Sequence, residues 1–256
     1  MIITSKNKRI LVVSDIHLDI PKINYILSKE NYDELAILGD VFDSHDERLE
    51  TPANFTKACY WLRRMVAEPN VYYVPGNHDS YLFPFNKHLL CSGWTPEKRR
   101  LADMAELGPF EKYFRFHLFI DDILCTHAGV HPYFLPPFID VCDLNALNNW
   151  LNEETEKAKI ALLNGQTHWF FGAGKARGGN LKYGGLTWCD AKREFEAVAG
   201  LKQVFGHSFN QSIYIPFKLP SSRDIAGAGN LCIDCNLNEY LIIENGKKQI
   251  MKYSDL

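Results

Sequence analysis

The sequence contains no long apolar run and no long basic run. Nothing in it approaches the roughly 20 consecutive apolar residues of a membrane span, and the apolar stretch before Asp15 is too short for a secretory signal. Lys and Arg number 28 against 31 Asp and Glu, a formal net charge of −3, whereas dedicated DNA or RNA binders are usually basic. We therefore expect a cytoplasmic protein with no membrane partner and no dedicated nucleic-acid surface.

Cysteine occurs in an odd number and without a regular pattern. The seven cysteines are scattered along the chain, unlike the disulfide framework of a small secreted domain. Cys232 and Cys235 form a C-x-x-C with no second pair beside it, so we interpret the motif as a strand and a turn rather than half of a zinc site. Reduced thiols are expected.

The length and the apolar content fit one α/β domain over residues 1–256. With 46% hydrophobic residues, a single sandwich of this size can bury a sizeable core. Apolar runs and helical patterns alternate at the start of the chain, which favours parallel strands joined by helices. The predicted order strand, helix, strand, helix, strand runs over 10–14, 22–30, 35–38, 52–67 and 71–74.

The remainder of the chain predicts more strands and one long helix. Strands are expected at 114–120, 123–126, 201–205, 231–234, 240–244 and 249–253, and a helix at 144–163. Asn245-Gly246 is a strong signal for a hairpin turn between the last two strands. Segments 81–108 and 131–193 are expected to be insertions that roof a site.

Five short polar cassettes occur where predicted strands give way to loops. They are SDIH at 14–17, GDVFD at 39–43, GNHD at 76–79, THAG at 126–129 and GH at 206–207. In an α/β sheet, ligands bind beyond the carboxyl ends of the strands, so these segments should converge in space. The pattern predicts one site assembled from five loops.

The cassettes supply a particular set of metal ligands. Six donors stand out, namely Asp15, His17, Asp40, Asn77, His127 and His207. Oxygen and imidazole donors without thiolate suit Mn²⁺, Fe or Zn²⁺ rather than Ca²⁺ or an iron–sulfur cluster. If one carboxylate bridges, the six suffice for two ions about 3.5–4 Å apart, a pair that can clamp a phosphoryl group and activate a water. Hydrolysis of a phosphate ester is therefore predicted.

In order and spacing the cassettes resemble the D-x-H, G-D-x-x-D, G-N-H-[DE], H-A-G and G-H motifs of the calcineurin-like metallophosphoesterase superfamily. The resemblance is greatest to the phosphoprotein phosphatase branch, which includes serine/threonine phosphatases and diadenosine tetraphosphatase-like enzymes. The motifs span Ser14 to His207, most of the chain. The resemblance implies a four-layer α/β/β/α sandwich with mixed central sheets and the metals at one edge.

The resemblance also implies roles for these residues. Asp15 and His17 would bind the first metal, Asp40 would bridge the two metals, and Asn77, His127 and His207 would complete the second site, with Asn77 also contacting substrate. His78 would be the general acid that protonates the leaving oxygen, and Asp43 would orient it. A histidine suits this role because its pKa lies near neutrality and a nearby carboxylate fixes its tautomer. The nucleophile would be a hydroxide activated by the two metals.

Two departures from the family pattern bear on specificity. Ser44 and His45 follow Asp43 where phosphoprotein phosphatases usually have Arg-Gly, so one phosphate clamp is missing. Arg177, in the glycine-rich segment GAGKARGGN upstream of LTWCD, is our candidate for a substrate-binding replacement. The second departure is that Ser208-Phe209 follows His207 where many superfamily nucleases have G-H-x-H. This favours the phosphatase branch and implies a weakly held first metal.

Three functions follow from these expectations. The first is a metal-dependent phosphatase of phosphate monoesters, with serine/threonine phosphoproteins as candidate substrates, Mn²⁺ as the expected metal and Fe or Zn²⁺ as alternatives. The second is a hydrolase of dinucleoside polyphosphates or small phosphorylated metabolites. The third is a binding scaffold that keeps the fold without catalysis, which the complete ligand set and His78 disfavour. The expected partner is a phosphorylated substrate, either a phosphoprotein or a nucleotide.

Overall fold

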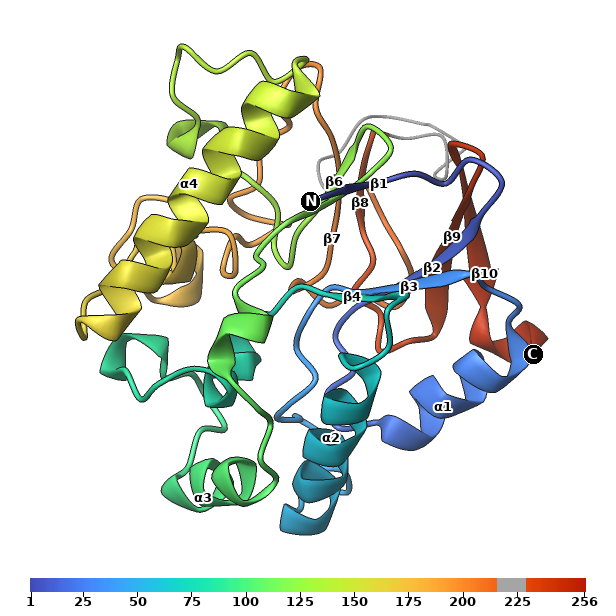
Figure 1. Cartoon of the computed structure of the whole chain (residues 1–256), viewed down its shortest axis with the longest axis vertical. Coiled ribbons are helices and arrows are strands. Elements are labelled where there is room, and N and C mark those ends of the chain that lie inside the picture. The colour runs from blue at the N-terminus through green and yellow to red at the C-terminus, as the bar shows by residue number, and fades with distance from the viewer. Residues whose placement is uncertain (216–228) are drawn as a thin grey trace.

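Two five-stranded sheets form the centre of the molecule, and helices lie outside them (Figure 1). The computed structural model describes residues 1–215 and 229–256. One sheet has the order β1-β5-β6-β7-β8 and the other the order β10-β9-β2-β3-β4, with parallel and antiparallel pairs in both. The strands are β1 (Ile2–Ile3), β2 (Arg9–Val13), β3 (Glu34–Ile37), β4 (Val71–Tyr73), β5 (Leu118–Ile120), β6 (Ile123–Cys125), β7 (Lys202–Phe205), β8 (Asn230–Cys232), β9 (Glu239–Glu244) and β10 (Lys247–Lys252).

Four α-helices and seven short 3₁₀ helices are found among the described residues. The α-helices are α1 (Ile20–Lys29), α2 (Pro52–Met65), α3 (Pro96–Met104) and α4 (Leu144–Leu163). The 3₁₀ helices are η1 (Asn77–Leu82), η2 (Lys87–Leu89), η3 (Phe110–Tyr113), η4 (Pro132–Phe134), η5 (Trp169–Phe171), η6 (Lys175–Arg177) and η7 (Tyr253–Asp255). None of the helices described is both long and apolar enough to cross a membrane.

Side-chain alternation along the strands creates the layers. Val12 of β2 and Val204 of β7 belong to one buried cluster, which fills the space between the sheets. The neighbouring Leu11 points the other way and packs in a second cluster with Ile23 of α1 and Phe55 of α2. This two-residue alternation is what a strand covered on both faces requires. Leu124 of β6 and Leu147 of α4 belong to the second cluster too, so the predicted α/β/β/α layering is confirmed.

Side-chain caps fix where the helices begin. Asp19 accepts the N–H of Lys22 at 3.1 Å at the start of α1, and Thr51 accepts the N–H of Asn54 at 3.2 Å at the start of α2. Each capped donor would otherwise lack an intrahelical partner. These caps set the lengths of the loops that follow β2 and β3, and both loops carry site residues.

Most predicted elements are found within a few residues of their expected bounds, and α4 has the predicted bounds. The hairpin turn is also confirmed, because Asn245 and Gly246 both have positive φ, 49° and 74°, as the tight turn between β9 and β10 requires. The prediction of a strand over 114–120 was wrong for its first half. Strand β5 begins only at Leu118, and the rings of Phe114 and Phe116 pack against each other before it. The sequence analysis also missed β1 and α3.

Candidate metal centre and active site

The five cassettes lie at one edge, beyond the carboxyl ends of β2, β3, β4, β6 and β7. Their ligand atoms form two groups, in each of which every atom lies within 4.8 Å of the others. Asp15, His17 and Asp40 make one group, and Asp40, His127 and His207 make the other. Asp40 therefore lies between two potential cation positions, as the predicted bridging role requires.

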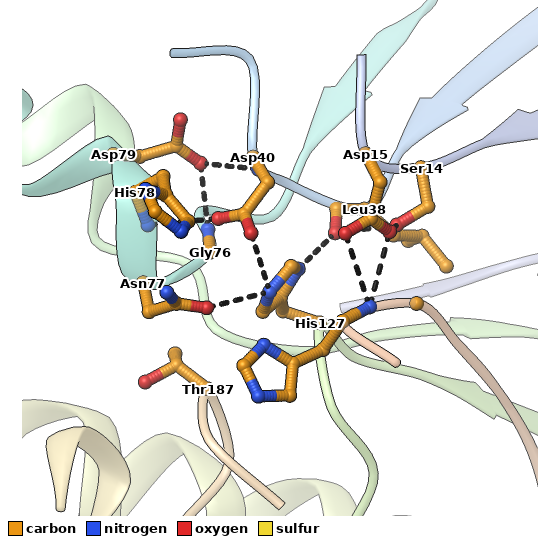
Figure 2. Close-up of polar contacts among 12 residues, drawn as sticks. Ser14, Asp15, Leu38, Asp40, Gly76, Asn77, His78, Asp79, His127 and Thr187 are labelled. Carbon is orange, nitrogen blue, oxygen red and sulfur yellow. Dashed lines mark hydrogen bonds and ion pairs between the residues drawn. The ribbon is translucent and has the colours of Figure 1, made fainter. Parts of the chain in front are cut away.

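Distances within the second group are short. Asp40 Oδ2 lies 3.2 Å from His127 Nε2, and Asn77 Oδ1 lies 3.1 Å from the same nitrogen (Figure 2). In the first group, His17 Nε2 lies 3.7 Å from Asp15 Oδ1 and 4.0 Å from Asp40 Oδ2. The structure thus brings together the six ligands that the sequence predicted.

Two of the imidazoles, those of His17 and His127, are hydrogen-bonded to backbone carbonyls through Nδ1, the nitrogen that faces away from the site. His17 Nδ1 lies 2.8 Å from the carbonyl oxygen of Asp43, and His127 Nδ1 lies 2.7 Å from that of Leu38. A ring nitrogen that faces a carbonyl carries the proton, so the other nitrogen is left as a lone-pair donor. Both Nε2 atoms therefore face the site. Against the effect of burial, Asp40 raises the pKa of His127 to about 9, so a cation bound there would displace the proton on His127 Nε2.

Asp79 joins two of the loops that carry ligands. Its carboxylate accepts the backbone N–H groups of Asp40 at 2.8 Å and Gly76 at 2.7 Å (Figure 2). It also accepts the backbone N–H of Val41 at 3.0 Å. Gly76 is also needed for its size, because a Cβ there would lie 2.2 Å from Asp40 Oδ1 and 2.7 Å from the His127 ring. The turn-forming role that Asp commonly has thus extends here to fixing the backbone of Asp40.

The electrostatics of the site favour a bound cation. Burial raises the pKa of Asp15 to about 7. The charge of Asp40 adds to this rise, and His127 opposes it. Burial also acts on Asp40, but neighbouring imidazoles, above all His127, hold the pKa of Asp40 well below its usual value. His207 is buried with no partner for Nε2, and burial keeps its pKa well below the usual value. Adjacent buried carboxylates and a neutral, unpartnered imidazole fit divalent cations.

His78 and Asp43 form a hydrogen-bonded pair beside the metal ligands. His78 Nδ1 lies 3.1 Å from Asp43 Oδ2, and both side chains are buried. The other oxygen of Asp43 accepts hydrogen bonds from Tyr81 at 3.0 Å and Lys98 at 2.6 Å. Cys91 Sγ lies 3.4 Å from His78 Nδ1. The sequence analysis predicted the His78–Asp43 pair but missed the lysine, the tyrosine and the cysteine around it.

The surroundings of His78 favour its charged form. Burial opposes protonation, but the charge of Asp40 and the hydrogen bond to Asp43 outweigh it and raise the pKa of His78 to about 12. Cations bound beside Asp40 would oppose this shift. With Nδ1 on Asp43, the ring nitrogen left for a substrate is Nε2.

Arg177 lies next to the second ligand group. Its Nε pairs with Asp190 Oδ2 at 2.8 Å, and one terminal nitrogen lies 3.3 Å from both the His207 carbonyl oxygen and Ser208 Oγ. Asp190 belongs to the LTWCD segment. About a third of the Arg177 side chain is exposed, so part of the guanidinium can still reach a ligand.

Asp234 is a site residue that the sequence analysis missed. It follows β8, so it lies at the same strand-end edge as the cassettes. Asp234 is 3% exposed and its Oδ1 has no hydrogen-bond partner, while the charge of Asp15 adds to burial in raising the pKa of Asp234 well above its usual value. The signal in the sequence is an aspartate at the end of the strand predicted at 231–234.

A cavity of about 470 Å³ opens beside the first ligand group. Its lining includes His17, His45, Lys22, Phe209 and Asp234. This volume is in the range of pockets that hold small organic ligands. A ligand in the cavity would therefore be in contact with a predicted metal ligand.

Two packed sheets with a buried carboxylate and imidazole cluster at their strand ends are typical of metal-dependent hydrolases. The sequence matches the calcineurin-like phosphoesterase family over residues 8–210. The chain belongs to this family, whose members are hydrolases acting on phosphate esters, and the resemblance drawn from the cassettes is confirmed.

Solved structures show a similar fold. The cold-active protein-tyrosine phosphatase of a psychrophilic Shewanella species matches with a TM-score of 0.58 at 16% identity, covering 99% of this chain and 80% of that chain. A further structure of a cold-active protein tyrosine phosphatase gives 0.56 at 16% identity, covering 99% and 79%. A serine/threonine phosphatase of Saccharomyces cerevisiae gives 0.49 at 12% identity, covering 98% and 83%. No curated protein matches the sequence.

Proposed function

We propose that the protein is a phosphatase that hydrolyses phosphate monoesters with the help of two divalent metal ions. The observation that carries this proposal is the position of Asp40, which is shared by two ligand groups beside the His78–Asp43 pair. In the proposed assignment Asp15, His17 and Asp40 hold the first ion, and Asp40, Asn77, His127 and His207 hold the second. An acid beside a paired cation site is what cleavage of a phosphate ester needs.

The chain's own residues account for the remaining steps. A bound metal pair would neutralise phosphoryl charge and activate a water as the nucleophile. His78 would give its Nε2 proton to the leaving oxygen while Asp43 holds Nδ1. Arg177 would grip a phosphate oxygen with the part of its guanidinium that Asp190 leaves free, and Asn77 would contact the same group.

Mn²⁺ is the metal that we propose, with Fe and Zn²⁺ as alternatives. Every proposed ligand is an oxygen or an imidazole nitrogen, which suits these three ions. All seven cysteines lie outside the two ligand groups, and Cys91 is grouped instead with His78 and Asp43. We also propose a cytoplasmic location, which the seven free cysteines support.

We first propose phosphoproteins carrying phosphoserine or phosphothreonine as substrates. This choice is favoured by the last motif, in which Ser208-Phe209 follows His207 and the second histidine of G-H-x-H is missing. The cavity beside His17 supports a second candidate, a dinucleoside polyphosphate or another small phosphorylated metabolite, because its volume of about 470 Å³ suits a small leaving group. A binding scaffold without catalysis is disfavoured by the presence of all six ligands and of His78.

The decisive experiment compares a phosphate monoester with a diester. Protein stripped with chelator is titrated with Mn²⁺ and assayed on p-nitrophenyl phosphate and bis-p-nitrophenyl phosphate. We expect metal-restored cleavage of the monoester, whereas Asp40→Asn should lose both ions and nearly all activity. Asp46→Asn is the matched control, because Asp46 lines the cavity beside His17 but belongs to neither ligand group and pairs with Arg48.

Three results would count against the proposal. Preferential cleavage of the diester would favour a phosphodiesterase, and silence on both esters with metal bound would favour the scaffold. Full activity of Asp40→Asn would remove the shared carboxylate from the mechanism. Among active outcomes, a comparison of phosphopeptides with diadenosine tetraphosphate ranks the two substrate classes.

A further inference from the structure

Lys98 is a buried lysine on α3, the helix that the sequence analysis did not predict. Only 8% of the residue is exposed. Its ammonium group donates to Asp43 Oδ1 at 2.6 Å and to the Gly93 carbonyl at 2.9 Å, and it pairs with Glu50. Burial of an ammonium is costly unless it is paired and hydrogen-bonded. The three oxygens satisfy this condition and fix the lysine against Asp43.

The two oxygens of Asp43 have different partners. Lys98 and Tyr81 both donate to Oδ1, at 2.6 and 3.0 Å. Oδ2 faces His78 Nδ1 at 3.1 Å. Rotation of the carboxylate would break the two bonds to Oδ1, one of which is charge-assisted and therefore strong. Asp43 is thus clamped on the side opposite the histidine.

We infer that Lys98 is a positioning residue for proton transfer to the leaving group. By holding Asp43 Oδ1 it keeps Oδ2 on Nδ1 of His78, and this aims Nε2 at the leaving oxygen. In the step itself a water oxygen forms the new bond to phosphorus, and the protons of that water leave with the phosphate product. The bond from phosphorus to the leaving oxygen breaks, its electron pair stays on that oxygen, and the oxygen takes the Nε2 proton, which His78 regains from solvent. The inference rests on the proposed function, because it requires a phosphate ester at His78.

A purely structural role for Lys98 makes a different prediction, and the next residue provides the control. Arg99 also ties α3 to the rest of the chain, since it donates to the Phe83 carbonyl at 2.6 Å and to the Tyr81 carbonyl at 3.4 Å. It also pairs with Asp103, and no contact joins it to Asp43 among the described residues. Arg99→Met should therefore weaken the attachment of α3 and leave the Asp43 clamp in place.

The test is the dependence of rate on the leaving group. Metal-loaded wild type, Lys98→Met, Lys98→Arg and Arg99→Met are assayed on 4-nitrophenyl phosphate and phenyl phosphate, with bound metal and thermal midpoint measured for each. Protonation matters most for the poor phenol leaving group. We expect Lys98→Met to keep its metal but to lose about tenfold or more activity on phenyl phosphate beyond its loss on the nitrophenyl ester. Lys98→Arg should recover part of that loss, because it keeps the charge.

Several outcomes would overturn the inference. Equal losses of Lys98→Met on both esters would do so, as would the same change of ratio in Arg99→Met. If Lys98→Met fails to fold, Tyr81→Phe reports on the same clamp, since it removes the hydroxyl bond to Asp43 and keeps the ring packed on Phe42 and Phe55. The inference then requires a loss concentrated on phenyl phosphate. Wild type that cleaves neither ester with metal bound would defeat the proposed function itself.

Discussion

Four of the proposed metal ligands have a left-handed backbone conformation. The φ angles are 55° for Asp15, 46° for His17, 54° for Asp40 and 68° for His207. Such angles cost residues with a side chain about 1–3 kcal/mol each, and they collect at functional sites where the surroundings enforce them. The sequence identified these residues as candidate ligands but did not predict their left-handed backbone. That conformation is imposed by hydrogen bonds between distant segments, such as the one from His207 N–H to Asp15.

Arg177 offers a residue-scale test of substrate binding. Arg177→Ala should raise KM for a phosphate monoester about 10–100-fold with little change in kcat, since a charge-assisted hydrogen bond to phosphate contributes about 1.5–3 kcal/mol. Arg193→Ala is the matched control, because Arg193 is exposed and contacts the Ala176 carbonyl instead. An unchanged KM would exclude Arg177 from substrate binding. Bound metal is measured alongside, because Arg177 also contacts the His207 carbonyl.

At the scale of elements, the site depends on how the loops after β3 and β4 are joined. Asp79 provides this link by accepting three buried backbone N–H groups. In the sequence Asp79 is simply the last residue of the GNHD cassette. Its contacts to Asp40 and Val41 cross from one cassette to another, and a motif read along one chain segment does not contain that information.

Replacement of Asp79 should therefore cost stability. Asp79→Ala leaves three buried donors unpaired, and we expect the free energy of unfolding in chelator to fall by about 3–5 kcal/mol. Asp79→Asn keeps one acceptor oxygen and should lose less. Asp33→Ala is the control, since the Asp33 carboxylate accepts only one exposed backbone N–H, that of Arg9, among the hydrogen bonds described. Urea unfolding measures all three variants, and a loss below about 1 kcal/mol in Asp79→Ala would show that water replaces the carboxylate.

At the scale of the whole molecule, the two sheets and the helices around them bury groups far from the site. His117, which directly precedes β5, is 2% exposed, and its Nε2 lies 3.2 Å from Asn148 Oδ1 of α4. Burial lowers the pKa of His117 from 6.5 to about 3. The sequence analysis left this histidine unassigned. Its burial follows from α4 lying over the sheet, a contact between segments that no local pattern predicts.

His117 should make the stability of the fold depend on pH. Between pH 6.5 and 3 the unfolded chain binds the proton and the folded chain does not, so stability falls as pH falls through this window. From pH 7.5 to 5.5 the loss due to this one group should be about 1.3 kcal/mol. His117→Gln cannot titrate and should lack that part of the slope. Urea unfolding in chelator at pH 7.5 and 5.5 measures the change in the free energy of unfolding. An equal change in the wild type and in His117→Gln would contradict the prediction.

The sequence by itself determined the strands that end in polar cassettes and the candidate ligands, because apolar runs and short motifs are local properties of the chain. The layered fold was implied by the resemblance of those motifs to the family. The left-handed conformations of the candidate ligands, the link through Asp79, the unpaired Oδ1 of Asp234 and the clamp of Lys98 on Asp43 were decided only by tertiary structure. Each of these depends on packing and hydrogen bonds between segments far apart in sequence. The division of the chain into one domain with two roofing insertions stays a prediction.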